Sequence, residues 1–216
     1  MQPEISILIT AIDRPELHSM VVDKYSKYVD VANCKWNITI NSIFGKHLDT
    51  ENNFKTILKD SNVDIKVFET GGSRKDWYQS VKHVINTSYL DNPKLGYLWL
   101  EDDWLLTSDT TLSQDIQLLT KENSYIALAN RNEISFNPGI WSKFVFENLM
   151  YNSINEPKKS LGNRYIDGDN TNVERLCCPQ PAATKFVENF HILNRFKDIG
   201  REWQNYTIKT RSFNLK

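Results

Sequence analysis

Short, almost wholly apolar runs alternate with helix-like patterns along the first 130 residues of this chain. Residues 5–11 form the first run, and their β-branched side chains with little polar alternation are typical of a strand buried on both faces. Pro15 follows at a position that suits the first turn of a helix. Apolar residues then recur at helical spacing at Leu17, Met20, Val21 and Tyr28. A strand, a loop and a helix in this order predict the opening of a βαβ unit.

The same alternation continues toward residue 130. Four more strands are expected, at residues 36–44, 63–68, 96–100 and 125–129. Helical patterns begin after the turn Gly71-Gly72-Ser73 and again at Leu112. Strands that alternate with helices predict an α/β fold with a mostly parallel, doubly wound sheet of the Rossmann-like kind.

The character of the sequence changes after Arg131. Residues 131–180 are rich in Asn, Pro, Gly and aromatic side chains, and they predict long loops around a helix at 141–150. A further helix is expected at 181–190. No repeat or linker divides the chain, so we expect one domain over residues 1–216 with a loop-rich C-terminal region.

Charge and cysteine content narrow the class of protein. The chain has 26 basic and 27 acidic side chains, and a net charge of -1 gives no strong field for nucleic acid or an anionic membrane. No apolar run approaches the roughly 18 residues that a membrane-spanning helix needs. The N-terminus lacks the pattern of a secretory signal, and Cys34, Cys177 and Cys178 make no disulfide framework. We therefore expect a cytoplasmic protein with no membrane span and no nucleic-acid partner.

Three consecutive carboxylates follow the expected strand at 96–100. In a parallel α/β sheet, ligands bind beyond the carboxyl ends of the strands, where Glu101-Asp102-Asp103 lies. Adjacent carboxylates repel one another and are costly to bury, whereas Mg²⁺ or Mn²⁺ bound by their oxygens removes the penalty. The alternative is a solvated acidic strand end. Its place between a buried strand and the apolar Trp104-Leu105-Leu106 favours a metal or nucleotide site.

Three motifs in this order resemble the GT-A glycosyltransferases, and especially the N-acetylglucosaminyltransferase I family. Ile7-Leu-Ile-Thr-Ala-Ile-Asp-Arg-Pro15 resembles that family's first strand and Asp-Arg loop. Leu100-Glu-Asp-Asp103 resembles its EDD form of the DxD motif. Phe136-Asn-Pro-Gly-Ile-Trp141 resembles its Phe-x-Pro-Gly-x-x-Trp segment. The likeness extends over roughly residues 5–195.

The resemblance implies a role for each matching residue. Asp13 would bind the nucleobase or its surroundings, with Arg14 nearby. Glu101 and Asp102 would contact the ribose or the sugar ring, and Asp103 would ligate Mn²⁺ or Mg²⁺ directly.

The resemblance also implies different roles for the two parts of the chain. Residues 1–130 would bind a nucleotide sugar, with a UDP-sugar favoured, and residues 131–216 would form the acceptor side. The chain is shorter than the Golgi enzymes and lacks their anchor and stem, so neither the donor sugar nor the acceptor transfers. We expect metal-dependent transfer of a hexosyl or N-acetylhexosaminyl group to a glycan, lipid or protein hydroxyl.

Two basic side chains are further candidates for the site. Arg74 follows the Gly-rich turn and would meet a phosphate at a helix N-terminus, although a plain turn with a solvated arginine fits equally well. His191 follows the last expected helix, where many GT-A enzymes supply a histidine to the metal. A histidine satisfied by ordinary hydrogen bonds is the alternative.

A general base is expected from the C-terminal third, because the strands already supply the donor side. Asp167 is our first choice and Asp169 the second, since Tyr165-Ile-Asp-Gly-Asp169 resembles a Trp-Asp-Asp segment that holds the base in the similar family. An exposed Asp-Gly turn is the alternative. Glu147 and Glu174 are weaker candidates.

Two other functions remain open from the sequence. The first is a nucleotidyltransferase that makes sugar nucleotides, but such an enzyme should carry a Gly-rich basic loop where this chain has Asp13-Arg14-Pro15. The second is a non-catalytic carbohydrate-binding protein of the same fold, which would leave the acidic triplet without its cation. Trp141, Phe144 and Phe146 fit a sugar-stacking platform, but aromatic residues at helical spacing are more often core.

Overall fold

The computed structural model describes residues 2–59, 61–69, 74–129, 134–156 and 186–200. Its centre is an eight-stranded sheet in the order β3-β2-β1-β4-β7-β6-β8-β5. The strands are β1 Ile5–Ile12, β2 Lys35–Asn41, β3 Asn62–Phe68, β4 Gly96–Glu101, β5 Trp104–Leu106, β6 Ser124–Ala129, β7 Gly139–Trp141 and β8 Asn189–Asp198. The expected mixed, mostly parallel α/β sheet is confirmed.

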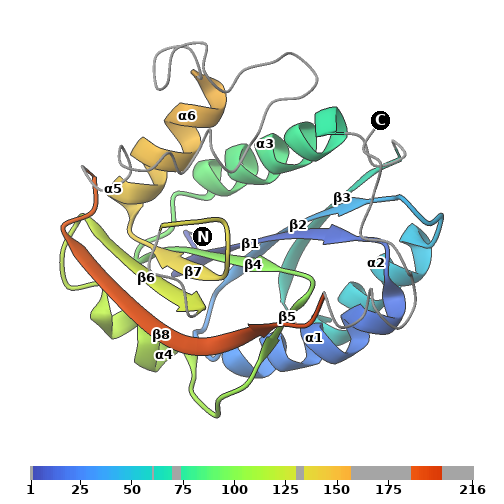
Figure 1. The fold of residues 1–216 in the computed structure, drawn as a ribbon, viewed down its shortest axis with the longest axis horizontal. Helices are drawn as coiled ribbons and strands as arrows, with labels where there is room; N and C mark the ends of the chain where they lie inside the picture. Colours follow the sequence, from blue (N-terminus) through green and yellow to red (C-terminus); the bar gives the residue numbers. More distant parts are fainter. Residues whose placement is uncertain (1, 60, 70–73, 130–133, 157–185, 201–216) are drawn as a thin grey trace.

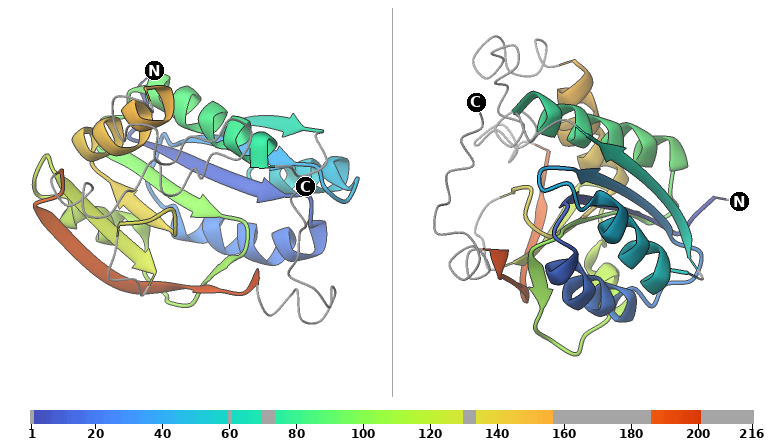
Figure 2. Two further views of the ribbon diagram at one scale, coloured as in Figure 1. Left: turned by 45° about the horizontal axis from the view of Figure 1, so that its top comes forward. Right: turned by 90° about the vertical axis from the view of Figure 1, so that its right-hand side faces the viewer.

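Helices cover both faces of the sheet (Figure 1). They are α1 Pro15–Tyr28, α2 His47–Ile57, α3 Arg74–Asp91, α4 Leu112–Asp115, α5 Lys143–Val145 and α6 Asn152–Asn155, with a 3₁₀ turn at Ile116–Leu118 and a π-helical turn at Phe146–Tyr151. Helices α1, α2 and α4 lie on one face, and α3, α5 and α6 lie on the other, as the two views of Figure 2 also show. The fold is therefore doubly wound.

The two halves of the sheet differ in strand direction. β1 runs parallel to β2 and β4, and β2 runs parallel to β3. β7 is antiparallel to both β4 and β6, while β8 is parallel to β6 and antiparallel to β5. The parallel half places the carboxyl ends of β1 and β4 side by side, and this edge holds the acidic triplet.

Strand β1 is buried on both faces because each face packs against a helix. Ile7 and Ile9 belong to the core on the α1 side, where Val21 and Tyr25 of α1 are fully buried. Leu8 belongs to the second core, beneath α3. Full burial of an aliphatic side chain of this size contributes about 1.5–3 kcal/mol to stability. These contacts therefore hold α1 against its face of the sheet.

The structure corrects the sequence analysis at several elements. Helix α2 was not expected, because its sequence buries only Thr50 and Phe54 and so has a weak apolar stripe. The helix expected at 141–150 begins instead at Lys143, since Trp141 ends β7.

The helix expected at 181–190 is wrong at its end, where Asn189 and Phe190 begin β8. Exposed and partly buried residues alternate along this strand, which is the period of a sheet face rather than of a helix. Strands β5, β7 and β8 were all missed. Within the described part of the chain, no helix has the length and apolar character needed to cross a bilayer.

Candidate active site

A tight turn of residues 101–104, here called the acidic turn, joins β4 to β5. β4 ends at Glu101, whose register partner in the parallel strand β1 is Thr10. The loop that carries Asp13 and Arg14 follows β1 at the same edge of the sheet. Two segments almost ninety residues apart therefore meet where an α/β sheet places its ligands.

Asp102 is the buried anchor of the acidic turn, with a residue exposure of 4%. One carboxylate oxygen accepts a hydrogen bond of 2.8 Å from Nη2 of Arg14. The other accepts from the backbone N–H of Ile12 at 2.9 Å and pairs with Nε2 of His18 at 2.8 Å. Both oxygens are thus already bonded within the protein, and a contact with ribose stays a prediction.

These partners keep Asp102 ionised. Burial disfavours the carboxylate, but the charge of Arg14 and the hydrogen bond from His18 outweigh it and hold the pKa of Asp102 well below its ordinary value. Breaking a buried ion pair by removing one partner costs about 3–5 kcal/mol. Arg14 is therefore committed to Asp102 and stabilises the turn from within.

Helix α1 also supports the backbone of the acidic turn. The hydroxyl of Tyr25 donates to the carbonyl oxygen of Trp104 at 2.6 Å and also contacts that of Glu101. Burial raises the pKa of Tyr25 well above its ordinary value, so the hydroxyl stays a donor. His18 and Tyr25 lie two turns apart on one face of α1, which thereby fixes both the backbone and the Asp102 side chain of the turn.

Asp103, like Glu101, is a partly exposed carboxylate of the acidic turn, with 27% of its side chain exposed. Burial raises its pKa to about 6, helped by the charges of Asp102 and Asp198 and opposed by that of Arg14. Gly200 lies against it, because a Cβ there would be 2.2 Å from Oδ2 of Asp103. The site therefore holds a crowded carboxylate that a cation would relieve.

The donor set fits a cation bound mainly by a ligand's own oxygens. Within the described residues there is no group of three or more His, Cys, Asp or Glu side chains placed to hold a metal. Asp103, with Asp198 close enough to raise its pKa, supplies one or two carboxylates. Mg²⁺ and Mn²⁺ are often held in this way, by one or two carboxylates together with substrate phosphates and water.

Asp13 shapes the loop after β2. Its carboxylate accepts hydrogen bonds from the backbone N–H groups of Ile43, Phe44 and Lys46 at 2.7–3.1 Å. The hydroxyl of Ser42 donates to the same carboxylate at 3.1 Å. Asp13 is fully buried, and its role at a nucleobase stays a prediction.

His191 does not lie where the sequence analysis placed it. It sits on β8 opposite Ile126, whereas the acidic turn meets the other end of β8, where Trp104 pairs with Asp198. Seven residues of strand separate His191 from Asp198, about 23 Å at 3.3 Å per residue. The expectation that His191 shares a cation with Asp103 is therefore corrected by the register of β8.

Asp198 is the acidic residue that the sequence analysis missed. No local motif marks it, because it reaches the site only through the pairing of β8 with β5. Its side chain accepts a hydrogen bond from the backbone N–H of Gly200 at 3.0 Å, and Ile199 donates its N–H to the carbonyl of Asp103. The end of β8 thus closes over the acidic turn.

The other expected site residues divide into two groups. The expected base residues Asp167 and Asp169, the weaker candidate Glu174, and the turn at 71–73 lie outside the described residues. Arg74 is placed as the first residue of α3. Glu147 is exposed on the π-helical turn.

The aromatic residues near β7 belong mainly to the core. Trp141 and Phe146 are fully buried, and Phe146 stacks on Tyr97 with 3.7 Å between ring centroids. Phe144 is 36% exposed. The core interpretation therefore holds for Trp141 and Phe146.

Solved structures with the same arrangement of strands and helices include a mannosyltransferase and a protein in complex with UDP-GlcNAc. The mannosyltransferase PcManGT from Pyrobaculum calidifontis, in complex with GDP-Man and Mn²⁺, has a TM-score of 0.52 at 12% identity over 69% of this chain and 47% of its own. S. aureus TarS 1–349 in complex with UDP-GlcNAc has a TM-score of 0.50 at 9% identity over 89% of this chain and 57% of its own. The fold is of the GT-A type. The chain spans about half the length of these two GT-A structures.

A third structure shares the fold but carries a different activity in its name. 4-Diphosphocytidyl-2C-methyl-D-erythritol synthase from Anaerococcus prevotii has a TM-score of 0.51 at 15% identity, over 88% of this chain and 86% of its own. No protein-family model and no curated protein sequence matches the chain. At these identities the comparisons establish the GT-A fold and leave the reaction to the residues of the site.

Proposed function

We propose that this chain is a metal-dependent glycosyltransferase that uses a nucleotide-sugar donor. The observation that carries the proposal is Asp103, a partly exposed carboxylate at the carboxyl edge of the parallel strands. Its neighbours Asp102 and Asp198 disfavour its charge, and a divalent cation bridging it to a diphosphate would remove that repulsion. The resemblance of the EDD triplet to the DxD motif supports the same interpretation.

The residues around Asp103 would each have a different role in the nucleotide-sugar site. A bound Mn²⁺ or Mg²⁺ would supply Lewis-acid stabilisation of the departing diphosphate. Asp103 would hold the cation, while Arg14 and His18 hold Asp102 and keep the turn in one conformation. Tyr25 keeps the backbone of the turn in place. A base on the acceptor side would take the proton of the attacking hydroxyl, and Asp167 remains our proposed residue, with Asp169 second.

A UDP-sugar is the proposed donor. The likeness to the N-acetylglucosaminyltransferase I family and the UDP-GlcNAc complex of TarS both support uridine, whereas PcManGT binds GDP-Man. Asp13 would act at the nucleobase through the loop that it holds at residues 42–46, and Arg74 would act on a phosphate at the start of α3.

A second candidate is a nucleotidyltransferase, because the synthase from A. prevotii matches this chain over most of both lengths. That reaction needs positively charged side chains close to β1 to hold a nucleoside triphosphate. In this chain the arginine after β1 is 2% exposed and committed to Asp102, and no Gly-rich loop follows the strand. The site geometry therefore favours the glycosyltransferase.

A thermal-shift screen of UDP, GDP, CDP, dTDP and CTP, each with Mn²⁺ and with EDTA, tests the proposal. We expect a nucleoside diphosphate, UDP first, to raise the melting temperature with Mn²⁺ and much less with EDTA, since stabilisation follows ligand occupancy. Asp103→Asn should abolish this difference, and Asp109→Asn, a change at an exposed carboxylate, should keep it.

Hydrolysis of the stabilising nucleotide sugar in the presence of Mn²⁺ would then identify the donor. Equal nucleotide affinity with and without metal would overturn the role of Asp103. Stabilisation by CTP together with release of pyrophosphate would point instead to the nucleotidyltransferase.

A further inference from the structure

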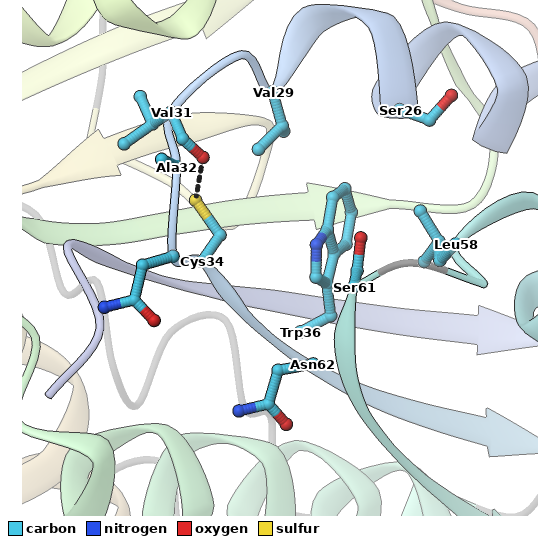
Figure 3. A pocket seen from close by; sticks show the side chains of 10 residues that line it. Ser26, Val29, Val31, Ala32, Cys34, Trp36, Leu58, Ser61 and Asn62 are labelled. Carbon is cyan, nitrogen blue, oxygen red and sulfur yellow. Dashed lines mark hydrogen bonds between the residues drawn. The ribbon is translucent and has the colours of Figure 1, made fainter. Parts of the chain in front are cut away.

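A cavity lies at the opposite end of the sheet from the acidic turn. Its volume is about 400 Å³, and Figure 3 shows its lining side chains. Cys34 and Asn62 stand at the amino ends of β2 and β3, and Val29 and Leu58 cap the carboxyl ends of α1 and α2. The acidic turn follows the carboxyl end of β4. The cavity is therefore separate from the proposed donor site.

The floor of the cavity is apolar but carries one unused donor. Trp36 and Leu58 line it, and each is only 2% exposed. The Nε1–H of Trp36 makes no hydrogen bond among the described residues. The indole lines the cavity (Figure 3), and a buried indole N–H ordinarily finds an acceptor.

The rim of the cavity is polar and uncharged. Asn33 donates from Nδ2 to the carbonyl of Gln2, which leaves its Oδ1 available as an acceptor. Asn62 accepts from Lys35 at Oδ1, which leaves its Nδ2 available as a donor. The side chain of Ser61 is exposed beside them. Among the described residues that line the cavity, none carries a formal charge.

We propose that this cavity binds a neutral sugar. A sugar ring presents C–H groups that would pack on Trp36 and Leu58, and hydroxyls that would both accept and donate hydrogen bonds at the rim. A charged ligand would find no counter-charge among the described lining residues, and a purely apolar one would leave the Trp36 N–H without an acceptor. The volume has room for one or two sugar units. This inference does not depend on the transferase assignment.

Cys34 provides a local reporter of occupancy. Its Sγ–H donates to the carbonyl of Val31 at 3.0 Å, and the thiol lines the cavity. Burial, followed by the charges of Asp30 and Glu4, raises the pKa of Cys34 to about 12, so alkylation is slow. A sugar in the cavity should slow it further, and peptide mapping by mass spectrometry would follow this thiol alone.

Saturation-transfer NMR with the methyl glycosides of glucose, galactose, mannose and N-acetylglucosamine tests the proposal. UDP and diamagnetic Mg²⁺ would be present throughout to occupy the donor site. We expect at least one glycoside to bind with millimolar affinity and to slow alkylation of Cys34. Ala32→Trp, which fills the cavity from an exposed lining position, should weaken binding at least about tenfold.

Two control variants separate this site from the donor site. Leu90→Trp adds the same side chain at a position that is 81% exposed outside the cavity and should leave binding unchanged. Asp103→Asn should also leave it unchanged while removing metal-dependent nucleotide binding. The proposal is overturned if none of the four glycosides binds, or if binding survives Ala32→Trp with Cys34 unprotected.

Discussion

Replacing Asp103 by Asn should stabilise the metal-free protein, and the gain should grow with pH. Folding raises the pKa of this carboxyl from its ordinary 3.8 to about 6, so the native state favours the protonated form. The contribution of Asp103 to stability is therefore fully present below pH 3.8 and is lost as the pH rises through 6. Asparagine cannot ionise, so the variant does not lose this stability as the pH rises.

The magnitude follows from the two pKa values. The difference between 3.8 and about 6 corresponds to about 3 kcal/mol at pH 7.5 and to about 1 kcal/mol at pH 4.5. For a chain of this length, 3 kcal/mol raises the melting temperature by about 6–12 °C. The ion pair of Arg14 with Asp102 at 2.8 Å survives the substitution, so no buried charge is left without its partner.

Urea unfolding of both proteins in EDTA at pH 4.5 and 7.5 measures this effect, with Asp109→Asn as the exposed control. A loss of stability at pH 7.5, or an equal gain at both pH values, would refute the argument that burial and the charges of Asp102 and Asp198 raise the pKa of Asp103. Adding Mn²⁺ should stabilise the wild type and reverse the order of the two proteins.

Substitutions at three further positions test the supports of the acidic turn. Tyr25→Phe removes the hydroxyl that bridges two carbonyls of the turn and should cost about 1–3 kcal/mol in urea unfolding, and an unchanged midpoint would contradict that role. His18→Ala removes a hydrogen bond to Asp102 and should raise the KM for the nucleotide sugar. His18→Gln keeps an N–H and should restore part of the affinity. Equal kinetics for the two variants would argue against a role of His18 in positioning Asp102. Gly200→Ala brings a methyl group against Asp103 and should weaken Mn²⁺ binding in calorimetry, and wild-type affinity would show that the end of β8 moves freely.

The fold class was open to prediction because the central strands β1, β2 and β4 carry their burial in their own sequence. Strand β1 is apolar on both faces, since helices cover both sides of the sheet, and residues 5–11 predict this directly. Strands β5 and β8 gave no such signal. β5 has only three residues, and β8 has partly exposed residues along most of its length, so its pairing with β5 depends on the rest of the sheet.

The position of the acidic turn at the carboxyl edge of the parallel strands was likewise predictable, but the partners of its carboxylates were not. Three adjacent carboxylates look alike in sequence, and their roles separate only through partners that are distant along the chain. Asp102 lies more than eighty residues from His18 and Arg14, yet it takes both as hydrogen-bond partners. Asp103 is left to face solvent, and Asp198 joins it from the end of β8.

The sequence by itself determined that strands alternate with helices and that carboxylates follow a buried central strand, because burial and repulsion between neighbours are local properties. The tertiary structure decided which carboxylate is an internal counter-ion and which is available to a cation. The register of β8 places Asp198 beside the acidic turn and His191 far from it, and strand register is set by packing across the whole sheet. The cavity beside Trp36 also depends on the tertiary structure, since two separate stretches of the chain, residues 26–36 and 58–62, line it and neither predicts it alone.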